Sequence, residues 1–356
     1  MPGYLSVIFG ILLFSILIFV HELGHFLTAK AFGVQVNEFA MFMGPAIFKK
    51  QVGETLYSIR CIPIGGYCSM EGEDQDTDNP RSFQKAAWWK RLIILVAGAA
   101  MNFLIGLVFF AIVLAPTKQF VSPVISEFTE CCVFNDKDGM QPGDKFYSID
   151  GERVYTGSNV TMLLGLNGTG KHDVVVIRDG QKVVFNDLDM AHKHTDENGE
   201  EYSHYGFSLT IEDATFTSKV KEIFCIMVDN VRSVRLSLQM LITGKAGFSD
   251  MAGPIGIVDM MSDAASAAPS FLDAVLNLLY FGGFLAVNLG VMNLLPIPAL
   301  DGGRVVALLL TTAIEGITKK KINPKFEGYI HGVGMILLLG LMAVVMFKDI
   351  FNIFKG

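Results

Sequence analysis

Four long apolar segments constrain this chain more than any other feature of its sequence. They run from about Tyr4 to Val20, Leu92 to Ala115, Ala274 to Leu295 and Ile330 to Phe347. Each reaches or approaches the ~20 residues that a helix needs to cross about 30 Å of hydrocarbon. Hydrophobic residues make up 51% of the 356 residues and charged residues only 18%, which excludes an ordinary soluble protein. The sequence therefore predicts a polytopic α-helical membrane protein with about four transmembrane helices.

Short basic loops orient these helices. Residues 81–91 hold four Lys or Arg residues and residues 304–325 hold five, whereas the first twenty residues hold none. The positive-inside rule then predicts that both basic loops are cytoplasmic and that both termini and residues 117–270 are extracytoplasmic. The end of the first span lies toward the cytoplasmic side. The net charge of −7, with no basic patch, excludes a nucleic-acid partner.

Turn residues and hydrophobic patterns divide the chain into seven predicted parts. These are a first transmembrane helix (1–33), a membrane-associated β-ribbon on the cytoplasmic side (34–80), a second transmembrane helix (81–116), an extracytoplasmic α+β domain (117–213), an amphipathic helix and a linker (214–270), a third transmembrane helix with a proline-rich segment (271–318), and a cytoplasmic loop with a fourth transmembrane helix (319–356). The ribbon has the alternative of being a loop that only covers the helices.

The inserted domain carries a turn-rich stretch, "DGMQPGDKFYSIDGERV", at Asp138–Val154. Its turns at Pro142-Gly143 and Asp150-Gly151 flank a strand-like segment, Lys145–Ile149. The stretch resembles a signature of PDZ domains, and it occurs once. Residues 217–243 have apolar side chains at every third or fourth position, which predicts an amphipathic helix that lies on the membrane surface or packs against this domain.

The first span ends in "HELGH", His21–His25, which is the H-E-x-x-H pattern. On a helix, residues i and i+4 share a face, so His21 and His25 point their imidazoles at one metal ion, and Glu22 lies beside them to accept a proton from water. Zinc is the expected metal, because two imidazoles with a carboxylate and an open position form a hydrolytic site. Polar residues inside a membrane helix are functional by default.

A third ligand is expected from "NLLPIPALDGGR", Asn293–Arg304. Pro296, Pro298 and the Gly302-Gly303 pair break the helix there, and broken backbone at membrane depth is tolerated where it lines a cavity or is buried. The predicted orientation puts Asp301 at the same depth as the two histidines. The alternative is that Asp301 only caps a helix at the membrane edge.

These motifs, together with "GPIGI" at Gly253–Ile257 and "MNF" at Met101–Phe103, resemble the site-2 protease family, and within it the bacterial regulator of sigma-E protease branch. The resemblance covers nearly the whole chain. It implies an intramembrane zinc metalloendopeptidase of the bacterial inner membrane, with His21, His25 and Asp301 as zinc ligands and Glu22 as the catalytic residue. The chain differs from some members in having one PDZ-like insert, and in "AGAAMNF" where many members have a Gly-Pro pair.

The resemblance also implies that Asn293 lies near the substrate backbone and that Asn102 has a role in substrate binding. For Asn293 the alternative is a hydrogen bond to its own proline-rich loop, and for Asn102 it is packing between helices. The expected substrates are single-span membrane proteins, namely a trimmed anti-sigma factor or remnant signal peptides. The strand-like ribbon would hold the unwound substrate as an added strand. Two other functions stay open on the sequence alone: a metal-binding membrane transporter, and a scaffold without activity that presents the PDZ-like domain.

Overall fold

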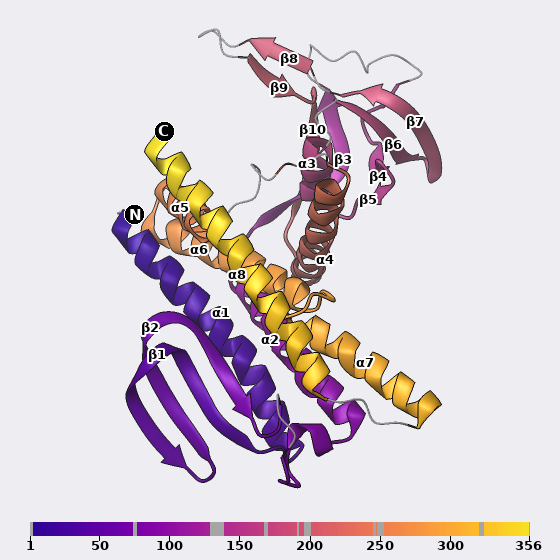
Figure 1. Cartoon of the computed structure of the whole chain (residues 1–356). Coiled ribbons are helices and arrows are strands. Elements are labelled where there is room, and N and C mark those ends of the chain that lie inside the picture. The colour runs from indigo at the N-terminus through magenta and orange to yellow at the C-terminus, as the bar shows by residue number, and fades with distance from the viewer. Residues whose placement is uncertain are drawn as a thin grey trace. The chain divides into compact units, whose positions relative to one another are not determined.

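The computed structural model describes residues 3–73, 77–128, 139–166, 170–190, 192–195, 201–244, 247, 253–319 and 324–355. The chain forms two compact units, one made of Met1–Val113 and Asn230–Gly356 and the other of Leu114–Asp229. The first unit contains the long apolar helices and a β-ribbon, and the second contains a β-sheet domain (Figure 1).

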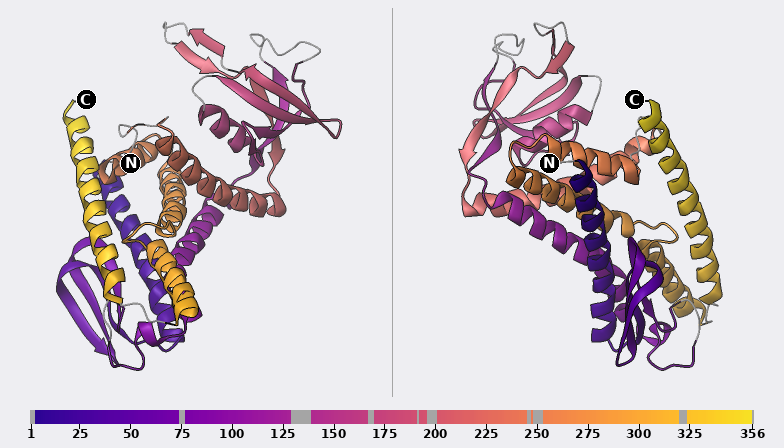
Figure 2. Two further views of the ribbon diagram at one scale, coloured as in Figure 1. Left: turned by 45° about the vertical axis from the view of Figure 1, so that its right-hand side comes forward. Right: turned by 90° about the vertical axis from the view of Figure 1, so that its left-hand side faces the viewer.

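Four helices of the first unit are long and apolar enough to cross a membrane: α1 (Gly3–Ala31), α2 (Trp88–Leu114), α6 (Phe271–Asn293) and α8 (Pro324–Lys355). Their candidate spans are Ile8–Ala31, Trp88–Leu114, Phe271–Asn293 and Gly328–Asp349. The start of α1 and the end of α8 lie at the same end of this unit (Figure 2). The protein is thus a multi-pass membrane protein, as the four apolar segments predict.

Four further helices lie between these spans in the chain, besides α3 of the second unit. They are the short 3₁₀ helix η1 (Phe83–Lys85) and the α-helices α4 (Phe216–Ile242), α5 (Pro254–Ser266) and α7 (Asp301–Thr318). The amphipathic pattern at 217–243 corresponds to α4. The segment expected as a linker after it contains α5, which starts at Pro254, a residue well suited to the first turn of a helix.

Helix α5 obtains its N-terminal cap from another helix. Its N-cap residue is Gly253, which has no side chain to offer. The buried Asp349 of α8 accepts a hydrogen bond from the backbone N–H of Gly256 at 3.1 Å. A Cβ on Gly253 would lie 2.5 Å from Asp349 Oδ2, so only glycine lets the carboxylate approach this closely.

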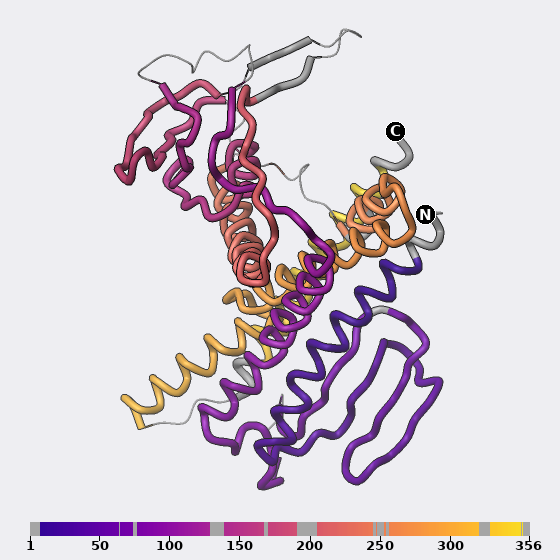
Figure 3. The backbone as a smooth tube through the Cα atoms, turned by 180° about the vertical axis from the view of Figure 1, so that it is seen from behind, coloured from indigo at the N-terminus to yellow at the C-terminus, as the bar shows by residue number. Residues whose placement is uncertain are grey.

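A β-ribbon lies alongside α1 (Figures 1 and 3). It consists of two long strands, β1 (Val36–Val52) and β2 (Thr55–Met70). The first part of β1 pairs with both ends of β2, because residues 38–41 have partners in Leu56–Ile59 and in Gly66–Ser69. Gly66–Met70 therefore forms one edge of the ribbon, on the side that faces α1.

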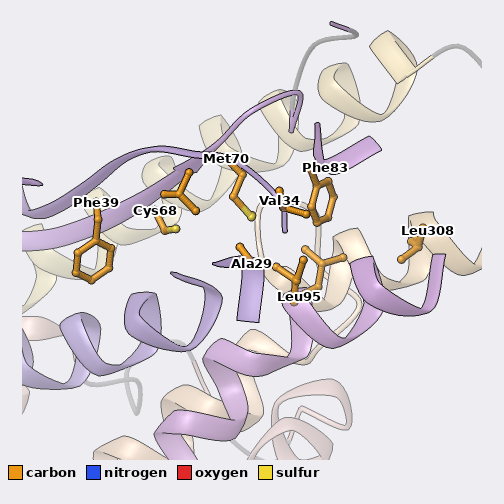
Figure 4. Packing of buried hydrophobic residues seen from close by; sticks show 10 residues of the cluster. Ala29, Val34, Phe39, Cys68, Met70, Phe83, Leu95 and Leu308 are labelled. Atoms are coloured by element: carbon orange, nitrogen blue, oxygen red, sulfur yellow. The ribbon is translucent and has the colours of Figure 1, made fainter. Parts of the chain in front are cut away.

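A buried cluster joins the ribbon to the helices (Figure 4). Its members come from α1, both strands, η1, α2 and α7, and they include Ala29, Val34, Phe39, Cys68, Met70, Phe83, Leu95 and Leu308. A second cluster joins α1 and α2 to α5 and α6 through Leu17, Phe109, Met261 and Leu278. Since α1 belongs to both clusters, its side chains are held from the two sides.

The second unit contains an antiparallel sheet in the order β10-β3-β4-β6-β7, with β5 paired to β4. Its strands are β3 (Gln119–Phe128), β4 (Lys145–Ile149), β5 (Glu152–Arg153), β6 (Lys171–Arg178), β7 (Gln181–Asp189) and β10 (Phe207–Asp213). Helix α3 (Gly157–Leu166) packs on β3, and a small pair, β8 (His192–Thr195) and β9 (Glu201–His204), lies between β7 and β10 in the chain. A mixed helix and sheet domain is thus present between the second and third spans.

Candidate metal centre

Helix α1 brings its two histidines onto one face. His21 and His25 are one turn apart and both are buried, at 8% and 6% exposure. Their rings meet edge to face with centroids 4.9 Å apart, and their Nε2 atoms are 3.2 Å apart. Two imidazole nitrogens thus converge on one point inside the first unit.

Helix α7 brings a carboxylate to the same point. Asp301 is the first residue of α7, and the N-cap position is occupied by Leu300, so the structure does not use Asp301 as a cap. Asp301 Oδ2 lies 3.1 Å from His21 Nε2 and 3.2 Å from His25 Nε2. Residues 276 positions apart in the chain are in this way brought within reach of one metal ion.

These three atoms fit a zinc ion. In a tetrahedral site with ligands about 2.0–2.1 Å from the metal, neighbouring ligand atoms lie about 3.3–3.4 Å apart. The observed separations of 3.1–3.2 Å are close to that value. His25 Nδ1 lies 2.8 Å from the carbonyl oxygen of Ile94, where only an N–H can bond. In the neutral ring, His25 Nε2 then carries the lone pair and faces the carboxylate of Asp301, which is the form of the imidazole that binds a metal ion.

Two asparagines contact the other histidine. Asn102, in the middle of α2, is fully buried, and its Nδ2 lies 3.1 Å from His21 Nδ1. Its Oδ1 has no hydrogen-bond partner in the described part of the chain. A half-turn of the amide would let Oδ1 accept a hydrogen bond from His21 Nδ1–H and leave Nε2 as the metal-facing atom. Asn293, at the end of α6, lies 3.4 Å from both ring nitrogens of His21.

Glycines give the imidazoles their space. A Cβ on Gly98 of α2 would lie 2.4 Å from His25 Nε2 and 2.7 Å from His21 Cε1. A Cβ on Gly24 of α1 would lie 2.4 Å from the carbonyl oxygen of Ala97, so α1 and α2 cross with their backbones in close approach. Sequence reasoning missed Gly98. The available signal was its spacing of four residues from Asn102, which puts both on one face of α2.

The proline-rich loop before Asp301 folds back over the start of α7. A Cβ on Gly302 would lie 2.3 Å from the carbonyl oxygens of Leu294 and Leu295, and one on Gly303 would lie 2.4 Å from that of Ile297. The Gly302-Gly303 pair is therefore required by packing, and the loop contacts the start of α7 while Leu294 and Pro296 stay exposed.

A pocket of about 360 Å³ opens beside the three converging side chains. Glu22, His25 and Asp301 lie in its wall together with the ribbon edge, Tyr67–Met70, and with Glu73, Leu95, Ala299 and Arg304. Glu73 and Arg304 form an ion pair across it. Burial and the hydrogen bond to Glu38 raise the pKa of Tyr67 to about 12, so this phenol stays protonated at neutral pH. The pocket thus has the carboxylate of Glu22, two of the three converging side chains and a strand edge in its wall.

Comparison with known proteins gives a consistent set of similarities. The model of peptidase family M50 matches residues 9–341. A predicted zinc metalloprotease of Clostridium perfringens is 36% identical over 345 residues, which cover 97% of this chain and 98% of that protein. The regulator of sigma-W protease RasP of Bacillus subtilis is 28% identical over 431 residues, with 98% of this chain and 99% of that protein covered. The zinc metalloprotease RasP of Geobacillus kaustophilus is also 28% identical, over 98% of each chain.

Proposed function

The chain belongs to peptidase family M50, and on that premise we propose that His21, His25 and Asp301 hold its zinc ion while Glu22 acts as its general base. It is an intramembrane zinc metalloprotease of regulated proteolysis. The observation that carries the assignment is the convergence of the two Nε2 atoms and Asp301 Oδ2 within 3.2 Å of one another. The relatives described above are named as proteases, which favours this function over the transporter and scaffold alternatives.

The reaction is the hydrolysis of a peptide bond within a transmembrane segment. When bound, zinc supplies Lewis acidity, which polarises a carbonyl oxygen and lowers the pKa of a water molecule. Glu22, in the wall of the pocket, takes the proton from the attacking water and delivers it to the amide nitrogen as the peptide bond breaks. Asn293 donates a hydrogen bond to the carbonyl oxygen of the substrate, and Asn102 orients His21.

The ribbon edge is the proposed binding site for the unwound substrate. A helical segment conceals its peptide bonds in its own hydrogen bonds, so it must be extended before hydrolysis. Tyr67–Met70 lies in the pocket wall with Glu22 and Asp301, and its pairing with β1 occupies only one side of the strand. An extended substrate that adds to the other side would pass directly in front of the catalytic residues.

The proposed substrates are single-span membrane proteins, among them a trimmed anti-sigma factor. The name of the Bacillus subtilis relative, a regulator of sigma-W protease, supports this class.

The proposed location is the bacterial inner membrane, with both termini and residues 117–213 outside and the zinc site toward the cytoplasm. A phosphatase reporter inserted at the β6–β7 turn, at Gly180, should be active outside the cell, and one at Lys319 should be inactive; the reverse pattern would invert the orientation.

The inserted domain, proposed as PDZ-like, would screen substrates by the size of their outer part. The chain enters and leaves this domain at one point, since the N–H of Ala214 bonds to the carbonyl oxygen of Lys118 at 2.8 Å. Residues 119–213 can therefore be excised by joining Lys118 to Ala214 through a short linker. The shortened protein should bind zinc and cut untrimmed substrates; a folded, zinc-loaded protein that still refuses them would contradict the screening role.

The assignment of the site is tested with purified protein and a single-span substrate in detergent. Glu22→Gln should keep about one zinc per chain and lose about 10²–10⁴-fold in cleavage, because the amide cannot accept a proton. Asp301→Ala should lose most of its zinc. Glu212→Gln, an exposed glutamate on β10, is the control and should behave as the wild type. Full zinc content in Asp301→Ala would remove Asp301 from the ligand set, and normal turnover in Glu22→Gln would remove the general base.

A further inference from the structure

The loop that carries Asp301 depends on one side chain from outside it. Two of its residues, Pro296 and Pro298, have no N–H to donate. Four other amides bond within the loop or to the end of α6: those of Leu294, Leu295, Ile297 and Leu300. The remaining one, the N–H of Ala299, donates to Nδ1 of His331 in α8 at 3.0 Å. This hydrogen bond ties the loop to a helix that follows it by about thirty residues.

Ala299 adopts a conformation that it would not keep by itself. Its φ is +80°, in the left-handed region that favours glycine, and it lies two residues before Asp301. A residue with a Cβ stays in this region only where the surrounding structure holds it. The hydrogen bond to His331 forms at this residue and fixes the direction of its N–H.

A glycine lets α8 come close enough for this contact. A Cβ on Gly334 would lie 2.4 Å from Pro298 Cβ and 2.8 Å from the backbone carbon of Pro298. His331 and Gly334 are three residues apart and so share a face of α8. Two other glycines of the helix, Gly332 and Gly340, have open space where a Cβ would be. The close approach is therefore specific to the face that carries His331.

We propose that His331 is a positioning residue for the metal site. By accepting the N–H of Ala299, it holds the loop in the conformation that directs Asp301 toward His21 and His25. Gly334 acts with it by letting α8 contact Pro298. This inference depends on the proposed role of Asp301 as a zinc ligand, and it adds a residue from the fourth membrane helix to the determinants of that site.

The experiment compares two replacements of His331 for zinc affinity, measured by competition with a chelator in detergent. In His331→Asn, Oδ1 takes the place of Nδ1 as an acceptor, so the affinity should stay within about threefold of the wild type. In His331→Leu the acceptor is absent, and the affinity should fall about 10–100-fold, the usual effect of losing an outer partner of a metal site. Thermal unfolding of the metal-free proteins should be similar for both variants.

Glycine variants give an independent test that does not alter the histidine. Gly334→Ala should lower the zinc affinity as His331→Leu does, because the added methyl group separates α8 from Pro298. Gly332→Ala, the matched control two residues away, should bind zinc as the wild type does. Both changes favour helix formation, so a loss in Gly334→Ala alone is not a loss of helix stability. If His331→Leu does not fold, this pair decides the question.

Wild-type affinity in His331→Leu, or an equal loss in His331→Asn and His331→Leu, would overturn the positioning role. Asp301→Ala, measured in the same series, separates this outcome from a failure of the site itself. Zinc retained in Asp301→Ala refutes the ligand assignment. Zinc lost there but retained in His331→Leu refutes only the role of His331.

Discussion

Two groups of polar side chains lie along α1, and they differ in how their charges are balanced. At the end of the helix, Lys30 Nζ lies 2.7 Å from Glu54 Oε1, and Arg81 also pairs with Glu54. Around His21 and His25, in contrast, two imidazole nitrogens and the carboxylate oxygen of Asp301 lie 3.1–3.2 Å apart, and none of the three side chains carries a fixed positive charge. The first group is complete as it stands and fastens the ribbon to the helix. The second group pairs a carboxylate with two imidazoles, whose charge depends on a bound proton or metal ion, and this makes it the candidate for function.

The largest loss of zinc affinity is expected when a substitution fills the space that the imidazoles of His21 and His25 occupy. In Gly98→Ala the new methyl carbon would lie 2.4 Å from His25 Nε2, about 1 Å inside ordinary contact. The imidazoles must move apart, so zinc affinity should fall more than about 100-fold, as measured by metal content after dialysis against a chelator. Gly316→Ala on α7, where a Cβ meets open space, is the control. Normal zinc content in Gly98→Ala would show that the two histidines tolerate another geometry.

A smaller effect is expected when a residue that contacts one of the proposed ligands is changed. Asn102→Leu removes the group that contacts His21 Nδ1 and should weaken zinc binding about 10–100-fold. Asn102→Asp retains an oxygen that accepts from Nδ1–H and should keep affinity near that of the wild type. The two variants are compared by chelator competition at one pH. Equal affinities in both would mean that Asn102 only packs between helices and does not orient His21.

The smallest effect, on stability alone, is expected when the ion pairs of Glu54 with Lys30 and Arg81 are removed. Hydrogen bonds from Arg81 and Lys30 lower the pKa of Glu54 from its ordinary value of 4.5 to about 2. A carboxylate whose pKa is lowered by folding stabilises the protein fully above its unfolded value, and this contribution is lost as pH falls from about 4.5 through about 2. Glu54 is partly exposed, so Glu54→Gln should cost less than about 1 kcal/mol near neutral pH.

The pH dependence of this last effect is its test. The difference in Tm between wild type and Glu54→Gln should be present at pH 6 and should shrink steadily between pH 4.5 and 3. Zinc content should be equal in the two proteins throughout the neutral range. A difference that grows on acidification would show that the anchoring pairs do not stabilise the ribbon.

The sequence predicts those features that depend on neighbouring residues. Hydropathy over about 20 residues indicates the four membrane helices, and the spacing of four residues puts His21 and His25 on one helical face. Asp301 could be proposed because prolines and glycines mark a break at the depth of the histidines. The alternation in residues 34–72 likewise indicates the strands of the ribbon.

Features that depend on what lies across a contact could not be predicted. Position 98 requires glycine because two imidazoles lie against it. The residues near Gly98 in the chain do not predict that these imidazoles come so close. The N–H of Ala299 donates a hydrogen bond to His331, and the sequence of the loop does not indicate which helix will supply the acceptor. The segment that contains α5 was expected to be a linker. The sequence near its start offers no capping side chain, since the cap comes from Asp349, more than ninety residues later.

Helix α8 contacts the loop before Asp301 through His331 and the start of α5 through Asp349, and these contacts imply an order of folding during synthesis. His331 and Asp349 follow the other described elements in the chain, so they leave the ribosome after the segments that they contact. Until α8 enters the bilayer, the N–H of Ala299 and the N-terminus of α5 lack their partners. The fold of the loop that carries Asp301 is therefore completed late in biogenesis. A nascent chain that already contains both halves of the proposed zinc site still lacks this support while its own apolar segments are being inserted nearby.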